Sequence, residues 1–253
     1  MPRLSLIVIT QDEERDLPGC LESAAIADET VIVDSGSHDA TMEIAKSRGA
    51  KVFSTRWRGD GPQRQFALEQ ATGDWVLNLD ADERISERLA SEIPRAIERV
   101  EVNGYYLPFQ TIFLGKHLRF GSSRNERHLR LFRRGKARFN ELAVHGGADV
   151  EGSVDSLSGP VIHDSYRSLD EYFEKFNAYT TAMAKQRRQA GLRFSTASAF
   201  RLPWRFFSRY ILRGGFLDGY AGFTYASLQA FYDFVKYAKL WDLEHGGEDA
   251  GKP

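Results

Sequence analysis

The sequence predicts an α/β protein with a mainly parallel sheet and a helical C-terminal part, and two patterns in it support this fold class. Between residues 4 and 100, segments of helical spacing separate short apolar runs, which are Leu4–Ile9, Thr30–Val33, Lys51–Ser54 and Trp75–Leu79. From Ser168 onward the spacing is helical in three stretches, near 168–190, 203–213 and 218–243. Strands joined by helices imply a sheet covered on both faces, whose ligands bind at the carboxyl ends of the strands.

The composition is that of a globular protein with one substantial core. The chain has 253 residues, of which 42% are hydrophobic and 27% charged, and its net charge of -1 excludes a generally basic nucleic-acid binder. The single cysteine, Cys20, leaves no intramolecular disulfide and no cysteine zinc site, so the composition suits the cytoplasm. The first apolar run ends too soon for a signal peptide, and no apolar run is long enough to span a bilayer, so we expect any membrane contact to be peripheral.

Two carboxylates follow the fourth predicted strand. Asp80 and Asp82 come directly after Trp75–Leu79, and hard oxygen ligands of this kind suit Mg²⁺ or Mn²⁺. A divalent ion at this position would bridge the phosphates of a nucleotide diphosphate and offset the charge on it as it leaves. The alternative is a solvated turn or helix cap. The position after a buried strand favours the metal site.

The second predicted strand also ends in a carboxylate. Asp34 is followed by the turn Ser35–Asp39, and it is placed to accept a hydrogen bond from a base or a ribose. The alternative is that Asp34 and Asp39 only cap the turn and the helix after it. Neither a Gly-x-Gly-x-x-Gly loop nor a phosphate loop with Gly-Lys-Ser/Thr follows any strand, which argues against a dinucleotide oxidoreductase and a phosphate-loop hydrolase.

Several ordered segments carry a family resemblance. Four of them resemble glycosyltransferase family 2: residues 4–14, 31–41, 61–68 and 71–83. Three more, residues 129–135, 162–166 and 215–219, resemble the subgroup of lipopolysaccharide-core transferases that add a β-linked glucose to inner-core heptose. The resemblance covers nearly the whole chain.

The resemblance implies a GT-A fold with a Rossmann-like mixed sheet and a helical C-terminal extension. It implies a UDP-sugar donor, a hexose (glucose first) as the transferred group, and inversion at the anomeric carbon by one direct displacement. We expect residues 1–165 to form the catalytic domain, with 1–102 as its nucleotide-sugar-binding half and 103–165 as its acceptor-side half. Residues 166–243 would form the extension and 244–253 a flexible tail.

The same resemblance assigns roles to individual residues. Thr10 and Glu13 would lie near the nucleoside, Asp34 on the base, Arg64 near the base or the phosphates, Asp80 near the ribose and the metal, and Asp82 on the metal. The subgroup has an acidic residue before its Leu-Arg-Leu-Phe segment, which here is Glu126, our candidate for the general base that takes the proton of the acceptor hydroxyl. The alternative is that Glu126 only pairs with Arg124, Arg127 or Arg130.

Candidates for contact with the acceptor include Arg130, His145 and His163. The histidines would orient phosphate or acceptor, although a lone histidine is more often structural. The subgroup usually has a glutamate after the histidine that corresponds to His145. In this chain Gly146 and Gly147 follow instead, which weakens any role for a glutamate there.

A basic stretch completes the set of candidates. Between Lys175 and Leu217 there are nine basic residues and no acidic one. Arg201, Arg205, Arg209 and Arg213 are four residues apart, so on a helix they would form one basic stripe next to several aromatic residues. We expect the stripe to meet an anionic membrane surface or the phosphates of a glycolipid. The alternative is a solvated basic face whose aromatics pack on the catalytic domain.

The sequence therefore predicts a metal-dependent hexosyltransferase, peripheral on the cytoplasmic face of a bacterial inner membrane, with a lipopolysaccharide-core-like acceptor. Two alternatives remain open at this point. One is a family 2 transferase for another glycan or a polyisoprenoid acceptor. The other is a non-catalytic sugar-nucleotide-binding module, against which the presence of Asp80, Asp82 and Glu126 argues.

Overall fold

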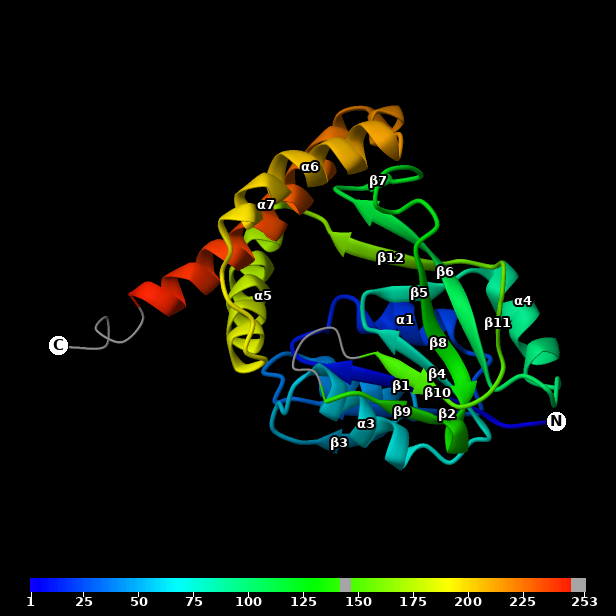
Figure 1. The fold of residues 1–253 in the computed structure, drawn as a ribbon. Coiled ribbons are helices and arrows are strands. Elements are labelled where there is room, and N and C mark those ends of the chain that lie inside the picture. Colours follow the sequence, from blue (N-terminus) through cyan, green and yellow to red (C-terminus); the bar gives the residue numbers. More distant parts are fainter. Residues whose placement is uncertain (142–146, 247–253) are drawn as a thin grey trace. The chain divides into compact units, whose positions relative to one another are not determined.

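The computed structural model describes residues 1–141 and 147–246, which fall into two compact units (Figure 1). The first unit consists of Met1–Gln110 and Glu126–Asp164, and the second of Thr111–Asn125 and the chain from Ser165 onward. Residues 111–125, which the sequence analysis grouped with the acceptor-side half, thus belong to the same unit as the C-terminal helices.

The first unit is built on a mixed sheet with a parallel centre. Its strand order is β3-β2-β1-β4-β8-β6-β12-β5, with β11 alongside β6. The bounds are β1 (Leu4–Thr10), β2 (Glu29–Asp34), β3 (Lys51–Ser54), β4 (Trp75–Asp80), β5 (Glu83–Ile85), β6 (Gly104–Phe113), β8 (Arg127–Arg133), β11 (Val154–Ser156) and β12 (Val161–Tyr166). A separate antiparallel pair joins β9 (Ala137–Phe139) to β10 (Ala148–Val150).

The register of the parallel strands brings their polar ends to one edge. β1 lies between β2 and β4 and is parallel to both, so the chain first moves outward to β3 and then returns to the other side of β1. In this register Thr10 is paired with Asp34 and Ile9 with Asp80. A reversal of strand order of this kind is where α/β sheets bind their ligands.

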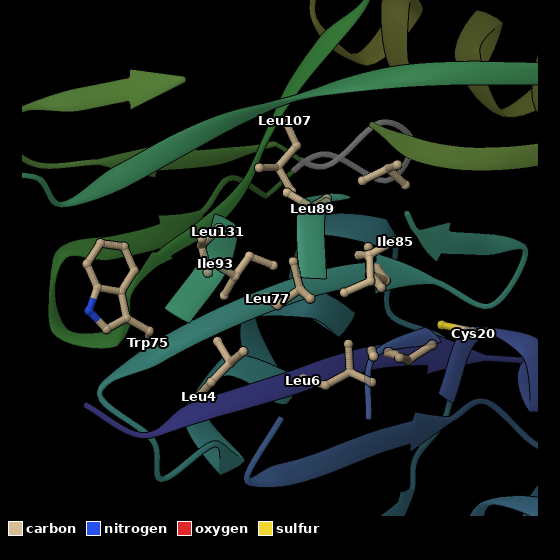
Figure 2. Close-up of a cluster of buried hydrophobic side chains, with 14 of the residues drawn as sticks. Leu4, Leu6, Cys20, Trp75, Leu77, Ile85, Leu89, Ile93, Leu107 and Leu131 are labelled. Atoms are coloured by element: carbon tan, nitrogen blue, oxygen red, sulfur yellow. The ribbon is translucent and has the colours of Figure 1, made fainter. Parts of the chain in front are cut away.

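Helices cover both faces of this sheet because alternate residues of its strands are apolar on either side. Leu4 and Leu6 of β1 belong to a core that includes residues of α1 (Leu17–Ser23) and α4 (Glu87–Ala96), as Figure 2 shows. Ile7 points to the opposite core, with residues of α3 (Asp60–Gln70). The remaining helix of this unit is α2 (Thr41–Ser47), which adds Ala45 to the first core.

The second unit is mainly helical. Helices α5 (Leu169–Gln189) and α7 (Gly219–His245) pack along each other, and α6 (Arg201–Phe207) lies on α7 (Figure 1). A π-helical turn, Ser208–Leu212, continues α6, and a short 3-10 turn, Gly215–Asp218, leads into α7. The short strand β7 (Lys116–His117) pairs with the end of β6. Among residues 1–141 and 147–246, no helix is both long and apolar enough to cross a membrane.

The helical stretches lie where the sequence predicts them, with one correction at the C-terminus. Helix α7 continues to His245, so the predicted flexible tail is helical at its start. Two contacts explain the extension: the His245 ring stacks on Trp241 with centroids 4.9 Å apart, and the Glu244 carboxylate accepts a hydrogen bond of 3.0 Å from the Phe194 backbone N–H.

Candidate functional site

The loops after β1 and β2 are held together by the Asp34 carboxylate. This side chain is fully buried and accepts hydrogen bonds from the hydroxyls of Thr10 (3.1 Å) and Ser37 and from the backbone N–H groups of Gly36 and Ser37. The backbone N–H of Glu13 donates to the Thr41 hydroxyl at 2.7 Å, which ties the β1 loop to the start of α2. The structure thus assigns Asp34 and Thr10 to fixing these loops, and their contact with a nucleoside stays a prediction.

The Asp80 carboxylate binds two buried guanidinium groups. Its Oδ1 lies 2.6 Å from Arg64 of α3, and its Oδ2 lies 3.1 Å from Arg130 of β8. The side chains of Arg64 and Arg130 are 7% and 13% exposed. Burial would raise the pKa of Asp80, but the two positive charges outweigh it and hold that pKa well below its ordinary value. Asp80 is therefore a permanent anion that joins three elements.

Glu83 is the acidic residue of this cluster that the sequence analysis did not single out. Its side chain is 1% exposed, and its two oxygens accept hydrogen bonds from Arg130 (2.6 Å) and from the Asp80 backbone N–H (2.9 Å). Burial, together with the nearby Asp80 charge, raises the pKa of Glu83 to about 7. Glu83 thus fixes the turn that carries Asp80 and Asp82.

Asp82 faces a different partner, His163 of β12. The Asp82 Oδ2 and the His163 Nε2 are 3.3 Å apart, and the two side chains are 20% and 30% exposed. Burial alone would lower the pKa of His163, but the Asp82 carboxylate outweighs this effect and raises it to about 9. The predicted pair Asp80 and Asp82 is therefore divided between a guanidinium cluster and an imidazole.

The chemistry of these donors decides how a divalent ion would be held. Within residues 1–141 and 147–246, no group of three or more His, Cys, Asp or Glu side chains is arranged to hold a metal. Both oxygens of Asp80 are bound by arginines, so Asp82 is the carboxylate of this pair that can offer an oxygen donor. His163, with its raised pKa, is protonated at neutral pH and offers no nitrogen donor in that state. A single carboxylate fits an ion that takes its other ligands from substrate phosphates and water, as Mg²⁺ commonly does.

Strand β8 connects the cluster with the candidate base. Glu126 directly precedes β8, which carries His128 and Arg130, and a register shift against β6 lies at Arg130. The Glu126 Oε1 lies 3.0 Å from the His128 Nε2, and the Glu126 side chain is 32% exposed. The ring of Phe109, on the neighbouring strand β6, meets His128 edge-on at 4.6 Å and lies under the Arg130 guanidinium at 5.4 Å.

The partner of Glu126 differs from the alternatives considered for it. Among the described residues, the Glu126 carboxylate contacts the His128 imidazole and not Arg124, Arg127 or Arg130. The alternation of polar residues in Glu126–Arg130 was the available signal for this dyad, because residues two apart on a strand point to the same side. Arg130 contacts Asp80 and Glu83, so its predicted contact with the acceptor stays a prediction. His145 lies outside the described residues.

The four arginines of the predicted stripe do not form one free face. Arg205 and Arg209 lie 3.3 Å and 3.1 Å from the Asp233 carboxylate of α7, and the Arg201 guanidinium lies 4.8 Å over the Tyr237 ring. The π-helical turn after Phe207 breaks the regular four-residue spacing. Arg213 is exposed. Arg201, Arg205 and Arg209 thus help to attach α6 and the turn after it to α7, and contact of the stripe with a membrane or with phosphates stays a prediction.

Comparisons with known proteins bear on the whole chain. The family model described as glycosyl transferase family 2 matches residues 5–150. The lipopolysaccharide core biosynthesis glycosyltransferase LpsC of Rhizobium meliloti is 34% identical over 247 residues, which cover 94% of this chain and 92% of LpsC. An uncharacterized glycosyltransferase of Rickettsia typhi is 31% identical over 258 residues, covering 96% of this chain and 88% of the relative. The crystal structure of S. aureus TarS 1-349 in complex with UDP aligns with a TM-score of 0.50 at 17% identity, covering 97% of this chain and 92% of TarS 1-349, a likeness in fold.

Proposed function

The chain belongs to glycosyltransferase family 2, in the subgroup similar to lipopolysaccharide-core enzymes, and from this premise we propose that it moves a hexose from a UDP-sugar to a glycolipid hydroxyl. It has the GT-A fold, a mixed α/β sheet followed by C-terminal helices. Glucose is the first candidate for the hexose, and a lipopolysaccharide-core-like glycolipid is the first candidate for the acceptor. The relative LpsC is described as a lipopolysaccharide core biosynthesis glycosyltransferase, which supports this class of acceptor.

One observation carries the proposal: the acidic turn after β4 and the Glu126–His128 dyad belong to the same sheet and are connected through Arg130. Arg130 contacts Asp80 and Glu83 directly, and it lies over the ring of Phe109, which also meets His128, the partner of Glu126. A donor held at the turn would thus have a carboxylate on the neighbouring strand for the acceptor side. A module that only binds sugar nucleotides would not need this second carboxylate.

The donor would be held by charge and by the strand-end loops. We assign the nucleoside to the loops after β1 and β2, with Thr10, Glu13 and Asp34, and the diphosphate to the turn at Asp80–Asp82. Arg64 and Arg130 reduce the repulsion between Asp80 and a diphosphate, because each places a positive charge beside that carboxylate. Asp82 would hold a Mg²⁺ or Mn²⁺ ion. When bound, such an ion neutralises charge on the diphosphate as it leaves.

The reaction would be one displacement with inversion. The acceptor oxygen forms a bond to the anomeric carbon while the bond from that carbon to the diphosphate oxygen breaks, and UDP leaves with the electron pair. Glu126 takes the proton of the acceptor hydroxyl as attack proceeds. His128 keeps the Glu126 carboxylate in one orientation through the 3.0 Å contact, so the base does not have to be ordered during the reaction.

The site of action that we propose is the cytoplasmic face of a bacterial inner membrane, with the protein bound peripherally. The buried free thiol of Cys20 suits a reducing compartment. A family 2 transferase for another glycan or a polyisoprenoid acceptor is the alternative, which differs from our proposal in the acceptor alone.

A panel of sugar nucleotides tests the proposal. Thermal stabilisation and donor hydrolysis are measured with UDP-glucose, UDP-galactose and UDP-N-acetylglucosamine, each with manganese, with magnesium and with chelator, because a bound ligand stabilises the protein by mass action. Transfer is then measured to deacylated lipopolysaccharide core. We expect one UDP-hexose to stabilise the protein in a metal-dependent way and to be transferred. Absence of stabilisation by every donor would overturn the proposed activity.

A further inference from the structure

The second unit exposes a large set of apolar side chains where α6 meets the start of α7. Trp204 and Leu212 are each 60% exposed, Leu217 is 58% exposed and Tyr220 is 83% exposed. We call the whole set the aromatic patch, and it consists of Trp204, Phe207, Ile211, Leu212, Phe216, Leu217, Tyr220 and Phe223. Single exposed apolar residues are ordinary, but a contiguous group of this size marks an interaction surface.

Ring contacts connect neighbouring side chains of the aromatic patch. The rings of Trp204 and Phe207 are 6.2 Å apart, and those of Tyr220 and Phe223 are also 6.2 Å apart. The half-buried ring of Tyr210 lies 6.3 Å from Phe216 and 5.5 Å from Phe223, which connects the 3-10 turn with the start of α7. The exposed side chains belong to α6, the following turns and the start of α7, and these elements pack against one another. Figure 1 shows the ribbons of α6 and the start of α7 together.

The local fold turns polar groups inward and apolar groups outward here. Arg205 and Arg209 point to the Asp233 carboxylate, which is 8% exposed. A side chain at Gly222 would place its Cβ 2.0 Å from the Gly215 carbonyl oxygen, so only glycine allows the 3-10 turn to lie this close to α7. Phe216 and Leu217, on that turn, are consequently exposed. This is the reverse of the usual amphipathic arrangement of a surface helix in a soluble protein.

Basic side chains border the aromatic patch. Arg213 lies within the same segment, Lys116 lies on β7, and Arg119 lies on the loop that follows β7; all three are exposed. Two contacts fix that loop beside the patch: Gly121 N–H donates to the Arg213 carbonyl at 3.0 Å, and Phe120 N–H donates to the Asp218 carboxylate at 2.9 Å. Asp218, the acidic residue nearest the patch in sequence, thus has its charge engaged by backbone N–H groups of this loop.

We propose that the aromatic patch is the surface by which this protein binds an anionic lipid bilayer. The apolar side chains would enter the boundary between headgroups and acyl chains, where Trp and Tyr are favoured, and Lys116, Arg119 and Arg213 would meet lipid phosphates. The inference rests on the proposed function in one respect, the membrane location of the acceptor. Of the predicted arginine stripe it keeps Arg213 alone, and it adds the aromatic patch, Lys116 and Arg119 as the contact surface.

The charge around the aromatic patch selects a bilayer over a second copy of this chain. A symmetric dimer through the patch would place two basic borders, each with Arg119 and Arg213, at one interface, with Asp218 already engaged. An anionic surface instead pairs with the basic border and accepts the apolar side chains. The apolar part predicts residual binding that salt does not remove, and the basic part predicts a preference for anionic lipid.

Vesicle flotation of the full chain tests the proposal with matched variants. The patch variant is Trp204→Gln with Leu217→Gln. The control is Trp241→Gln with Leu192→Gln, which removes residues of the same types and of similar exposure, 47% and 51%, in the same unit. Trp241 lies 21 residues beyond Tyr220 on α7, or roughly 30 Å along the helix. Vesicles are phosphatidylcholine alone or with phosphatidylglycerol, at low and high salt.

We expect the patch variant to bind anionic vesicles at least about tenfold more weakly than wild type, and the control to bind within about twofold of it. Arg119→Gln with Arg213→Gln should lower binding by about fivefold per charge at low salt and much less at high salt. Acyl chains brominated near the headgroup should quench the fluorescence of wild type more than that of Trp204→Phe.

Equal flotation of wild type and patch variant on every vesicle would overturn the proposal. So would a lipid-free dimer in analytical ultracentrifugation that the patch variant abolishes, because this result would assign the surface to a second copy. Hydrolysis of the donor without acceptor should be the same in wild type and patch variant. A protein that binds vesicles through the aromatic patch but transfers no sugar would refute the proposed function and leave this surface standing.

Discussion

The replacement Glu29→Gln is the sharpest test of how the sheet of the first unit is held together. Glu29 begins β2, at the end opposite to Asp34, and its side chain is 5% exposed. The carboxylate accepts hydrogen bonds from Ser5 of β1 (2.5 Å), from Lys51 of β3 (2.5 Å) and from both the backbone N–H and the hydroxyl of Thr72, before β4 (2.7 and 2.9 Å). One charge thus joins the amino ends of four neighbouring segments.

The size of the effect follows from the pKa of this carboxyl group. Although burial opposes the shift, the hydrogen bonds from Lys51, Ser5 and Thr72 lower the pKa of Glu29 from 4.5 to about 2. A shift of this size corresponds to roughly 3 kcal/mol of folding free energy at neutral pH. The Lys51 side chain is 55% exposed, so solvent screens part of its share, and we expect Glu29→Gln to cost about 2–3 kcal/mol.

The sign of the pH dependence is fixed by the direction of the shift. Because the folded-state pKa lies below the unfolded one, the stabilisation is fully present above about pH 4.5 and disappears as the pH falls through 2. The difference in unfolding free energy between wild type and Glu29→Gln should therefore be constant from pH 6 to 8 and shrink below pH 4.5.

Urea unfolding followed by circular dichroism at several pH values measures this difference. Donor-induced stabilisation should survive in Glu29→Gln, since the replacement is at the edge of the sheet opposite to the candidate site. A loss below about 0.5 kcal/mol at pH 7, or an equal loss at pH 3 and pH 7, would refute the reasoning.

Three further predictions concern the candidate site. Asp82→Asn should lower turnover by roughly 10²-fold or more and abolish stimulation by manganese, as measured by initial rates with and without chelator. Its melting temperature should stay within a few degrees of that of wild type. Full activity of wild type in chelator would contradict the metal role. Glu126→Gln should reduce transfer by roughly 10²-fold and leave the affinity for the donor unchanged, and a loss of donor affinity would instead assign Glu126 to the nucleotide site. His128→Ala should lower kcat by about tenfold without changing the donor KM, and His128→Asn, which keeps a donor toward Glu126, should recover most of that loss; a purely structural His128 would show no such recovery.

The fold was predictable because its signals are local. The four apolar runs of the first hundred residues became β1 to β4. β1, β2 and β4 are buried on both faces and so are apolar at nearly every position, whereas β3, at the edge of the sheet, is only partly buried. The observed strands extend one residue further, through Thr10, Asp34 and Asp80, because the backbone hydrogen bonds continue into the polar residues at the carboxyl ends. The edge of the sheet that we propose for ligand binding could also be predicted, because the polar residues directly follow the apolar runs in the sequence.

The pairings within the site were not predictable, because they join residues far apart in the sequence. Arg64 and Arg130 reach Asp80 from 16 and 50 residues away, and nothing near Asp80 in the sequence indicates that two guanidinium groups will meet there. The prediction of a single arginine stripe was wrong because of local structure. The four-residue spacing forms one stripe only on a regular helix, and a π-helical turn interrupts this helix. The spacing of residues along a helix does not show which of its faces packs against the other helices of the same unit.

The division between Asp80 and Asp82 follows from these long-range contacts. The two residues are of the same type and stand two positions apart, so the sequence presents them as equivalent metal ligands. Tertiary neighbours make them different: two arginines bind both oxygens of Asp80, whereas Asp82 faces the single imidazole of His163. A carboxylate engaged by two buried guanidinium groups has little negative charge left to attract a cation. We therefore propose Asp82 for the metal role, and we propose that Asp80 holds Arg64 and Arg130 at the place where the diphosphate would bind.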